Sequence, residues 1–86
     1  MQAVKNLSIT PNPSSGAFII SFDAYQSQPI QIKIYDLVGQ LIQEEYTVKV
    51  MGSYSKQINL GNAAKGMYIL QIRAGNEIIN NKIEIN

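Results

Sequence analysis

The chain has 86 residues, which is enough for one small domain and excludes a second lobe that could frame a deep cleft. Its composition, 45% hydrophobic and 15% charged with a net charge of +1, is that of a folded globular module and excludes a disordered chain. The seven lysine and arginine residues are scattered along the chain, so no basic cluster is available for a nucleic-acid backbone or an anionic membrane.

Alternation of apolar and polar residues begins near the N-terminus and predicts β-strands. A first short strand covers Val4–Ile9. Residues 11–16 (Pro-Asn-Pro-Ser-Ser-Gly) then predict a turn, because proline fixes φ, asparagine and serine bond locally and glycine accepts positive φ. The residues of the next two strands that we expect to face the core are Phe18, Ile20, Phe22, Ile30, Ile32 and Ile34.

A long strand with its turns follows in the middle of the chain. Residues 38–40 (Val-Gly-Gln) predict a tight hairpin into a strand over Leu41–Val50, with a bulge or break near Glu44 and Glu45. Residues 51–53 (Met-Gly-Ser) predict another hairpin. The inward-facing residues that we expect in the first of these strands are Tyr46, Val48 and Val50, and Tyr54, Ile58 and Leu60 indicate another strand after the turn.

The last third of the chain adds two further strands. Residues 62–66 lack alternation and predict a single helical turn that ends on Gly66. A hairpin at residues 74–76 joins the last two strands, whose expected inward residues are Tyr68, Leu70, Ile72, Ile79, Ile83 and Ile85. About seven short strands with frequent turn signals predict an all-β fold, an immunoglobulin-like β-sandwich of antiparallel strands, in a single domain over residues 1–86.

Residue types that support catalysis are scarce. The sequence has no histidine and no cysteine, which excludes Ser-His-Asp and Cys-His arrangements, disulfides and thiolate metal sites. The adjacent Glu44 and Glu45 would point to opposite faces of a strand and cannot flank one bond. A pair of Ser53 or Ser55 with Lys56 is conceivable, but nothing marks either serine as activated. We therefore predict no catalytic residues and no enzymatic activity.

Candidate ligand sites are equally weak. Asp36 lacks the Asp-x-Asp spacing of a calcium loop, so we predict that its carboxylate accepts backbone N–H groups in its own turn. The glycines form no phosphate-binding pattern, and we predict no metal and no cofactor. Five tyrosines could form a sugar-stacking platform, but their spacing favours core packing with the hydroxyl group at the edge; they are Tyr25, Tyr35, Tyr46, Tyr54 and Tyr68.

Four short motifs occur in order along the chain. Residues 11–16 read Pro-Asn-Pro-Ser-Ser-Gly, residues 35–39 read Tyr-Asp-Leu-Val-Gly, residues 66–68 read Gly-Met-Tyr, and Lys82 lies in a final hairpin. Their order and spacing resemble the type A C-terminal sorting domain of the type IX (Por) secretion system of Bacteroidetes-like bacteria, which reads PNPxxG, Y-D-x-x-G, G-x-Y and a final hairpin with a lysine near its end.

The resemblance covers the chain from about Ser8 to Ile85, with two departures. Thr10 stands before the first motif, where the family often has tyrosine. The chain ends Glu84-Ile85-Asn86, whereas many members end on a basic residue.

The resemblance implies a role in protein export. Such domains end secreted enzymes, adhesins and motility proteins, whose carriers cross the inner membrane by a signal peptide. The outer-membrane translocon then recognises the folded domain, and a surface sortase removes it, so that the cargo is released or linked to lipopolysaccharide. For this chain the resemblance implies an attached N-terminal cargo and a location at the cell surface or in the medium. Because residues 1–6 lack an apolar core, the signal peptide is expected upstream.

The residues that the resemblance implies for sorting are Pro11, Asn12, Pro13, Gly16, Asp36, Gly39, Gly66, Tyr68, Gly75, Lys82 and Ile83. Several have structural tasks as well, because prolines stiffen a turn, glycines supply positive φ and Tyr68 fills core. We expect recognition to read the folded surface and the last hairpin, residues 67–85. The free edge of its terminal strand could also template pairing with a partner strand, including a strand-swapped dimer of the isolated domain.

Two other functions stay open from the residues alone. An accessory module for binding carbohydrate or for protein adhesion would carry an exposed row of aromatic residues on one flat face. The sequence has no tryptophan and 8% aromatic residues, which disfavours such a row. A small enzyme is disfavoured by the lack of histidine and by the length of the chain.

Overall fold

The chain folds into five β-strands. This computed structural model describes residues 4–61 and 63–86, with the side chains of Gln26 and Val48 outside the description. The strands are β1 (Val4–Thr10), β2 (Ala17–Asp36), β3 (Leu41–Asn59), β4 (Gly66–Ala74) and β5 (Glu77–Ile85). All pairs are antiparallel, in the order β1-β2-β4-β5 with β3 also paired to β2. The predicted all-β fold is confirmed. Within the described ranges, no helix is long and apolar enough to cross a membrane.

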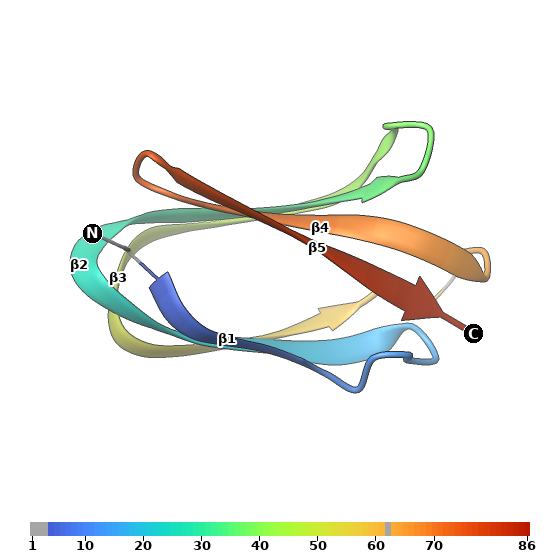
Figure 1. Cartoon of the computed structure of the whole chain (residues 1–86), viewed down its shortest axis with the longest axis horizontal. Helices are drawn as coiled ribbons and strands as arrows, with labels where there is room; N and C mark the ends of the chain where they lie inside the picture. Colours follow the sequence, from blue (N-terminus) through green and yellow to red (C-terminus); the bar gives the residue numbers. More distant parts are fainter. Residues whose placement is uncertain (1–3, 62) are drawn as a thin grey trace.

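β2 and β3 are long because both strands bend instead of ending. Residues 17–24 of β2 lie in one layer beside β1, and residues 30–36 lie in the other layer beside β4. The ladder between β2 and β3 shifts register between Ala24 and Gln28, where both strands turn from one layer to the other (Figure 1). The five strands therefore supply seven antiparallel segments in one curled sheet whose two halves face each other. This arrangement fits the predicted β-sandwich.

The hairpin predicted at residues 51–53 is wrong. β3 runs through these residues without interruption, and Gly52 pairs with Ala24 across the bend. Gly52 has a φ of 83°, a conformation that glycine adopts readily. Glycine here lets a strand turn a corner between layers instead of reversing direction.

The same bend changes which face of β3 points inward. Thr47 lies opposite the inward-facing Ile30, yet Val50 is also buried, so an extra residue enters between them. Val50 therefore faces the core as predicted, whereas the prediction for Tyr46 is wrong, since its side chain is 62% exposed. At Glu44 and Glu45 themselves the ladder is regular, and its register shifts lie on either side, between Leu41 and Gln43 and between Thr47 and Val50.

The described residues 63–66 do not form the predicted helical turn; Asn62 lies outside the described residues. The N–H of Ala63 donates to the carbonyl of Leu60 at 2.7 Å, and the hydroxyl group of Tyr68 donates to the carbonyl of Ala64. The N–H of Ala63 and the carbonyl of Ala64 are therefore satisfied by individual bonds and not by a helical repeat.

The core lies between the two layers and is built from alternate residues of every strand. Its fully buried large side chains are Ile20, Ile30, Ile32, Ile34, Ile58, Leu70 and Ile72. β-branched isoleucine suits this position, because it packs well on a pleated surface. The ring of Tyr68 is in the core, and β5 contributes Ile83 and Ile85. The predicted inward faces of residues 18–22, 30–34, 68–72 and 83–85 are confirmed.

The end of β5 is held by the connection between β1 and β2. The N–H of Ser14 donates to the carbonyl of Glu84, and the carbonyl of Ser14 accepts the N–H of Asn86, both at 2.9 Å. The side-chain oxygen of Asn12 accepts the N–H of Glu84 at 3.0 Å, and its Nδ2 donates to the carbonyl of Lys82 at 3.3 Å. We call these four hydrogen bonds the C-terminal clamp. They occupy the outer edge of β5 from Lys82 onward.

The burial of Ile83 predicts a larger effect on stability than that of Ile78, an exposed isoleucine of the same strand. Ile83 is 2% exposed, whereas Ile78 is 52% exposed. We expect Ile83→Ala to lower the free energy of unfolding by about 2–5 kcal/mol, because it removes buried methyl groups and leaves a cavity. Ile78→Ala should change it by less than about 0.5 kcal/mol. Urea denaturation of both variants measures this, and equal effects would contradict the described facing of β5.

The side-chain bonds of Asn12 predict a second, smaller effect. Asn12→Ala removes two exposed hydrogen bonds to the β5 backbone and should lower the free energy of unfolding by about 1–2 kcal/mol. Asn86→Ala is the matched control, because the side chain of Asn86 makes no hydrogen bond to the described residues. Thermal unfolding of the two purified variants compares them. If Asn12→Ala is as stable as the control, the side chain of Asn12 does not help to hold β5.

Candidate recognition site

All but one of the predicted sorting residues lie at one end of the sandwich, although they are scattered along the sequence. The sheet register brings them together, since Asp36 lies opposite Tyr68, Tyr68 opposite Ile83, and Gly66 opposite Ile85. The clamp adds the connection over residues 11–16 to the same end, which is marked by the C-terminus in Figure 1. We call it the clamp end. Gly75 is the exception, because it lies in the β4–β5 turn at the opposite end.

The connection between β1 and β2 forms the base of the clamp end. Pro11, Asn12 and Pro13 are exposed, and the peptide bonds before both prolines are cis. Ser14 is 5% exposed, and its hydroxyl oxygen accepts the N–H of Gly16 at 3.3 Å. The carbonyl of Gly16 accepts the N–H of Leu60, which ties the start of β2 to the end of β3. The motif thus links β1 and β2 to the ends of β3 and β5 and offers an exposed proline-rich surface.

The turn between β2 and β3 is fixed by Asp36. Its Oδ1 accepts the N–H of Val38 at 3.0 Å and that of Gln40 at 2.9 Å. The Asp36 carbonyl accepts the N–H of Gly39 at 3.1 Å, and Gly39 has a φ of 91°. The predicted role of Asp36, to accept backbone N–H groups in its own turn, is confirmed. Leu37 and Val38, between Asp36 and Gly39, project into solvent.

A hollow of about 550 Å³ opens beside this turn. The residues that line it are Asp36, Ile42, Gln43, Asn59, Leu60, Gly61, Ala63, Ala64 and Tyr68. Most of these side chains are apolar, so the hollow suits an apolar group better than a charged one.

Groups that could support chemistry are engaged in other bonds. The hydroxyl of Ser53 donates to Asp23 at 3.3 Å, and that of Ser55 lies 3.1 Å from the hydroxyl of Ser21. The ammonium group of Lys56 pairs with Glu45 at 3.3 Å, so it activates neither serine. Across residues 4–61 and 63–86, no three acidic side chains gather to hold a metal ion.

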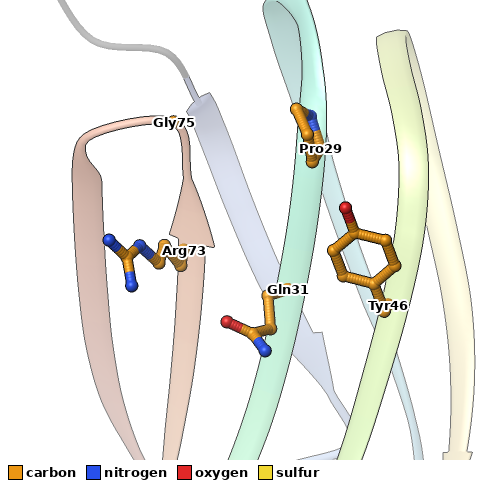
Figure 2. Close-up of a pocket in the computed structure, with 5 residues that line it drawn as sticks. All are labelled: Pro29, Gln31, Tyr46, Arg73 and Gly75. Atoms are coloured by element: carbon orange, nitrogen blue, oxygen red, sulfur yellow. The ribbon is translucent and has the colours of Figure 1, made fainter.

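A second, smaller hollow of about 240 Å³ lies on the outer face of the sheet (Figure 2). Gln31 of β2 lies opposite both Arg73 of β4 and Tyr46 of β3, so these three side chains share one row across the sheet. Tyr46 is the one aromatic residue among the lining residues, whereas a sugar-stacking platform needs several rings in a row. Of the other tyrosines, Tyr25 is 49% exposed and the ring of Tyr54 packs on Phe22 with centroids 4.9 Å apart.

The sequence reasoning missed several residues of the clamp end. Ser14 and Asn86 were not singled out, because the bonds of Ser14 to Glu84 and Asn86 join segments about 70 residues apart and no periodicity reveals such a pairing. The local signal was the Ser-x-Gly turn at Ser14, whose hydroxyl group satisfies the backbone of Gly16. Leu37 and Val38 were read as parts of a motif and not as an exposed surface.

The sequence of the chain matches a known protein family. A family model described as "Secretion system C-terminal sorting domain" matches residues 8–86. The chain is 30% identical to an ulvan lyase of Nonlabens ulvanivorans over 86 residues, which are 99% of this chain and 15% of that protein.

Among solved structures, the fold is similar to part of beta-glucosidase 3B from Thermotoga neapolitana, solved in complex with glycerol. The TM-score is 0.62 at 10% identity, covering 96% of this chain and 15% of the glucosidase. This likeness concerns the fold alone. The match of the family model to nearly the whole sequence is decisive, and this chain belongs to the family of secretion system C-terminal sorting domains of the type IX pathway.

Proposed function

We propose that this chain is the export signal of a larger protein, read by the outer-membrane translocon of the type IX system and then removed by a cell-surface sortase. The observation that carries the proposal is the gathering of the family's motif residues at the clamp end. Residues far apart in sequence meet at one surface there, and a receptor can read a surface of this kind only on the folded domain.

The position of the N-terminal strand supports an N-terminal cargo. β1 begins at the end of the sandwich opposite the clamp end (Figure 1). The molecule is 35 Å long, so a cargo joined before β1 would leave the clamp end accessible. The chain spans 15% of the length of the ulvan lyase that it resembles, which supports a role as one module of a larger protein, such as a secreted polysaccharide lyase. A signal peptide at the start of that protein would bring it to the periplasm.

Some residues of the clamp end are exposed and can contact a receptor, and others are buried and support the exposed surface. Pro11, Pro13 and Lys82 are exposed and can contact a receptor directly. Tyr68 and Ile83 are buried and would act by holding the surface in shape. The clamp covers the last part of the β5 edge, so a strand-swapped dimer would form only after the clamp opens.

A secretion assay tests the proposed function. The domain, with its native upstream linker, is fused behind a fluorescent reporter that carries a signal peptide, in a bacterium with a working type IX system and in a translocon-deficient strain. We expect the reporter on the surface or in the medium of the working strain alone, shortened by the mass of the domain. A reporter without the domain should stay in the periplasm of both strains.

Retention of the intact, folded fusion in the periplasm of both strains would refute the sorting role. Release without shortening would refute the sortase step alone. In the first case an accessory binding module becomes the better account, and binding of the purified domain to polysaccharides would then be measured.

A further inference from the structure

The hairpin between β2 and β3 presents apolar side chains to solvent at the clamp end. Val38 is 88% exposed, Leu37 65%, Leu41 47% and Ile42 39%. We call these four residues the apolar tip. Single exposed apolar residues are ordinary on a protein surface, but a group of four on one hairpin is a feature of interaction sites.

The apolar tip is held in one conformation. Four hydrogen bonds close the turn, two to the carboxylate of Asp36 and two between the backbones of Asp36, Gly39 and Gln40. The hairpin extends away from the body of the sandwich, as the green segment of Figure 1 shows. A partner that binds the tip would therefore not have to order a flexible loop, which lowers the entropic cost of association.

The hollow of about 550 Å³ lies beside the tip and shares Ile42 with it. Leu60, Ala63 and Tyr68 add to the apolar part of its wall, which also includes the polar side chains of Asp36, Gln43 and Asn59. The projecting tip and the adjacent hollow together form an uneven surface. Such a surface is complementary in shape to another uneven protein surface, and less so to the flat surface of a membrane.

The charges around the tip favour the same partner. Residues 37–43 contain no charged side chain, and the carboxylate of Asp36 is used within the turn. Hairpins or helices that lie on membranes usually combine apolar residues with lysine, arginine and aromatic residues, which this segment lacks. A neutral apolar segment is complementary to a neutral apolar protein surface.

We propose that the apolar tip and the adjacent hollow dock onto a hydrophobic surface of a protein component of the outer-membrane type IX machinery. This inference rests on the proposed sorting function and names a surface centred on the β2–β3 hairpin, which includes Tyr68 of the last hairpin. The clamp already occupies the outer edge of β5 from Lys82 onward, so less of that strand is free to bind a partner.

The test compares two double variants in the secretion assay. L37S with V38S removes the two most exposed side chains of the tip. Met51→Ser with Tyr25→Ser is the matched control, because these residues are 69% and 49% exposed but lie outside the tip and outside the last hairpin. Burying two apolar side chains at an interface contributes enough for more than about a tenfold change in affinity. We expect the tip variant to reduce export at least about tenfold and the control to stay within about twofold of the unchanged domain.

Folding is checked on the purified domains, whose thermal unfolding should match. Val38→Lys serves as a second tip variant if the double variant is unstable, since a charge at the most exposed position should block an apolar contact without disturbing the core. If the unchanged domain is exported and both tip variants are exported equally well, the docking surface is refuted and the sorting function stands. If the unchanged domain is not exported, the sorting function fails, and the proposed partner with it.

Two further measurements test whether a lipid surface or a second copy of the chain binds the apolar tip instead of the proposed protein partner. Flotation of the purified domain with vesicles of phosphatidylethanolamine and lipopolysaccharide, lost in the tip variant, would identify a lipid surface and overturn the proposal. Sedimentation that reveals a dimer, lost in the tip variant, would identify a second copy and also overturn it. We expect a monomer that does not float.

Discussion

The bridge between Ser14 and the end of β5 is the interaction on which the clamp end depends. A sheet that curls into two layers brings its first and last strands near each other, and these strands must be joined or left as open edges. Here the β1–β2 connection joins them through four hydrogen bonds to Lys82, Glu84 and Asn86. Held in this way, β5 places its two C-terminal isoleucines in the core opposite the start of β4, and β4 in turn pairs with the end of β2. The motifs of the family therefore lie at strand ends that are hydrogen-bonded to one another.

The two open sides of the curled sheet are closed by different means. On the side of β3, polar groups from its two halves meet across the layers, with Lys56 and Glu45 at 3.3 Å and the hydroxyl groups of Thr47 and Tyr54 at 3.3 Å. Partly exposed pairs of this kind contribute little to stability, but polar and charged side chains at a sheet edge disfavour its pairing with a strand of another molecule. On the side of β1 and β5, the clamp closes one end, and the N–H of Val4 bonds Glu77 at the other. The exposed apolar side chains lie mostly away from these two edges, above all at the β2–β3 hairpin.

Much of the fold could be predicted from the sequence, because alternation fixes which residues of a strand face the core. That reasoning located the buried residues of β4 and of both halves of β2, and the local turn at Asp36. It failed where a strand bends without stopping, since Gly52 gives the same signal in a bend as in a hairpin. The extra residue between Thr47 and Val50 then reversed the facing of Tyr46. The clamp could not be predicted, because all four bonds reach backbone groups of a segment distant in sequence, and the residue type of Asn12 does not reveal which distant backbone groups its side chain binds.

Amide hydrogen exchange measured by NMR at Asn86 tests the central claim most directly. The last residue of a chain normally exchanges at the rate of an unfolded peptide, since nothing holds its N–H. In this structure that N–H donates to the carbonyl of Ser14 at 2.9 Å. The account predicts that the amides of Asn86 and Ser14 exchange at least about tenfold more slowly than in an unfolded peptide. Exchange of both at the unfolded rate, with the amides of β4 protected, would show that the end of β5 is free and would contradict the account.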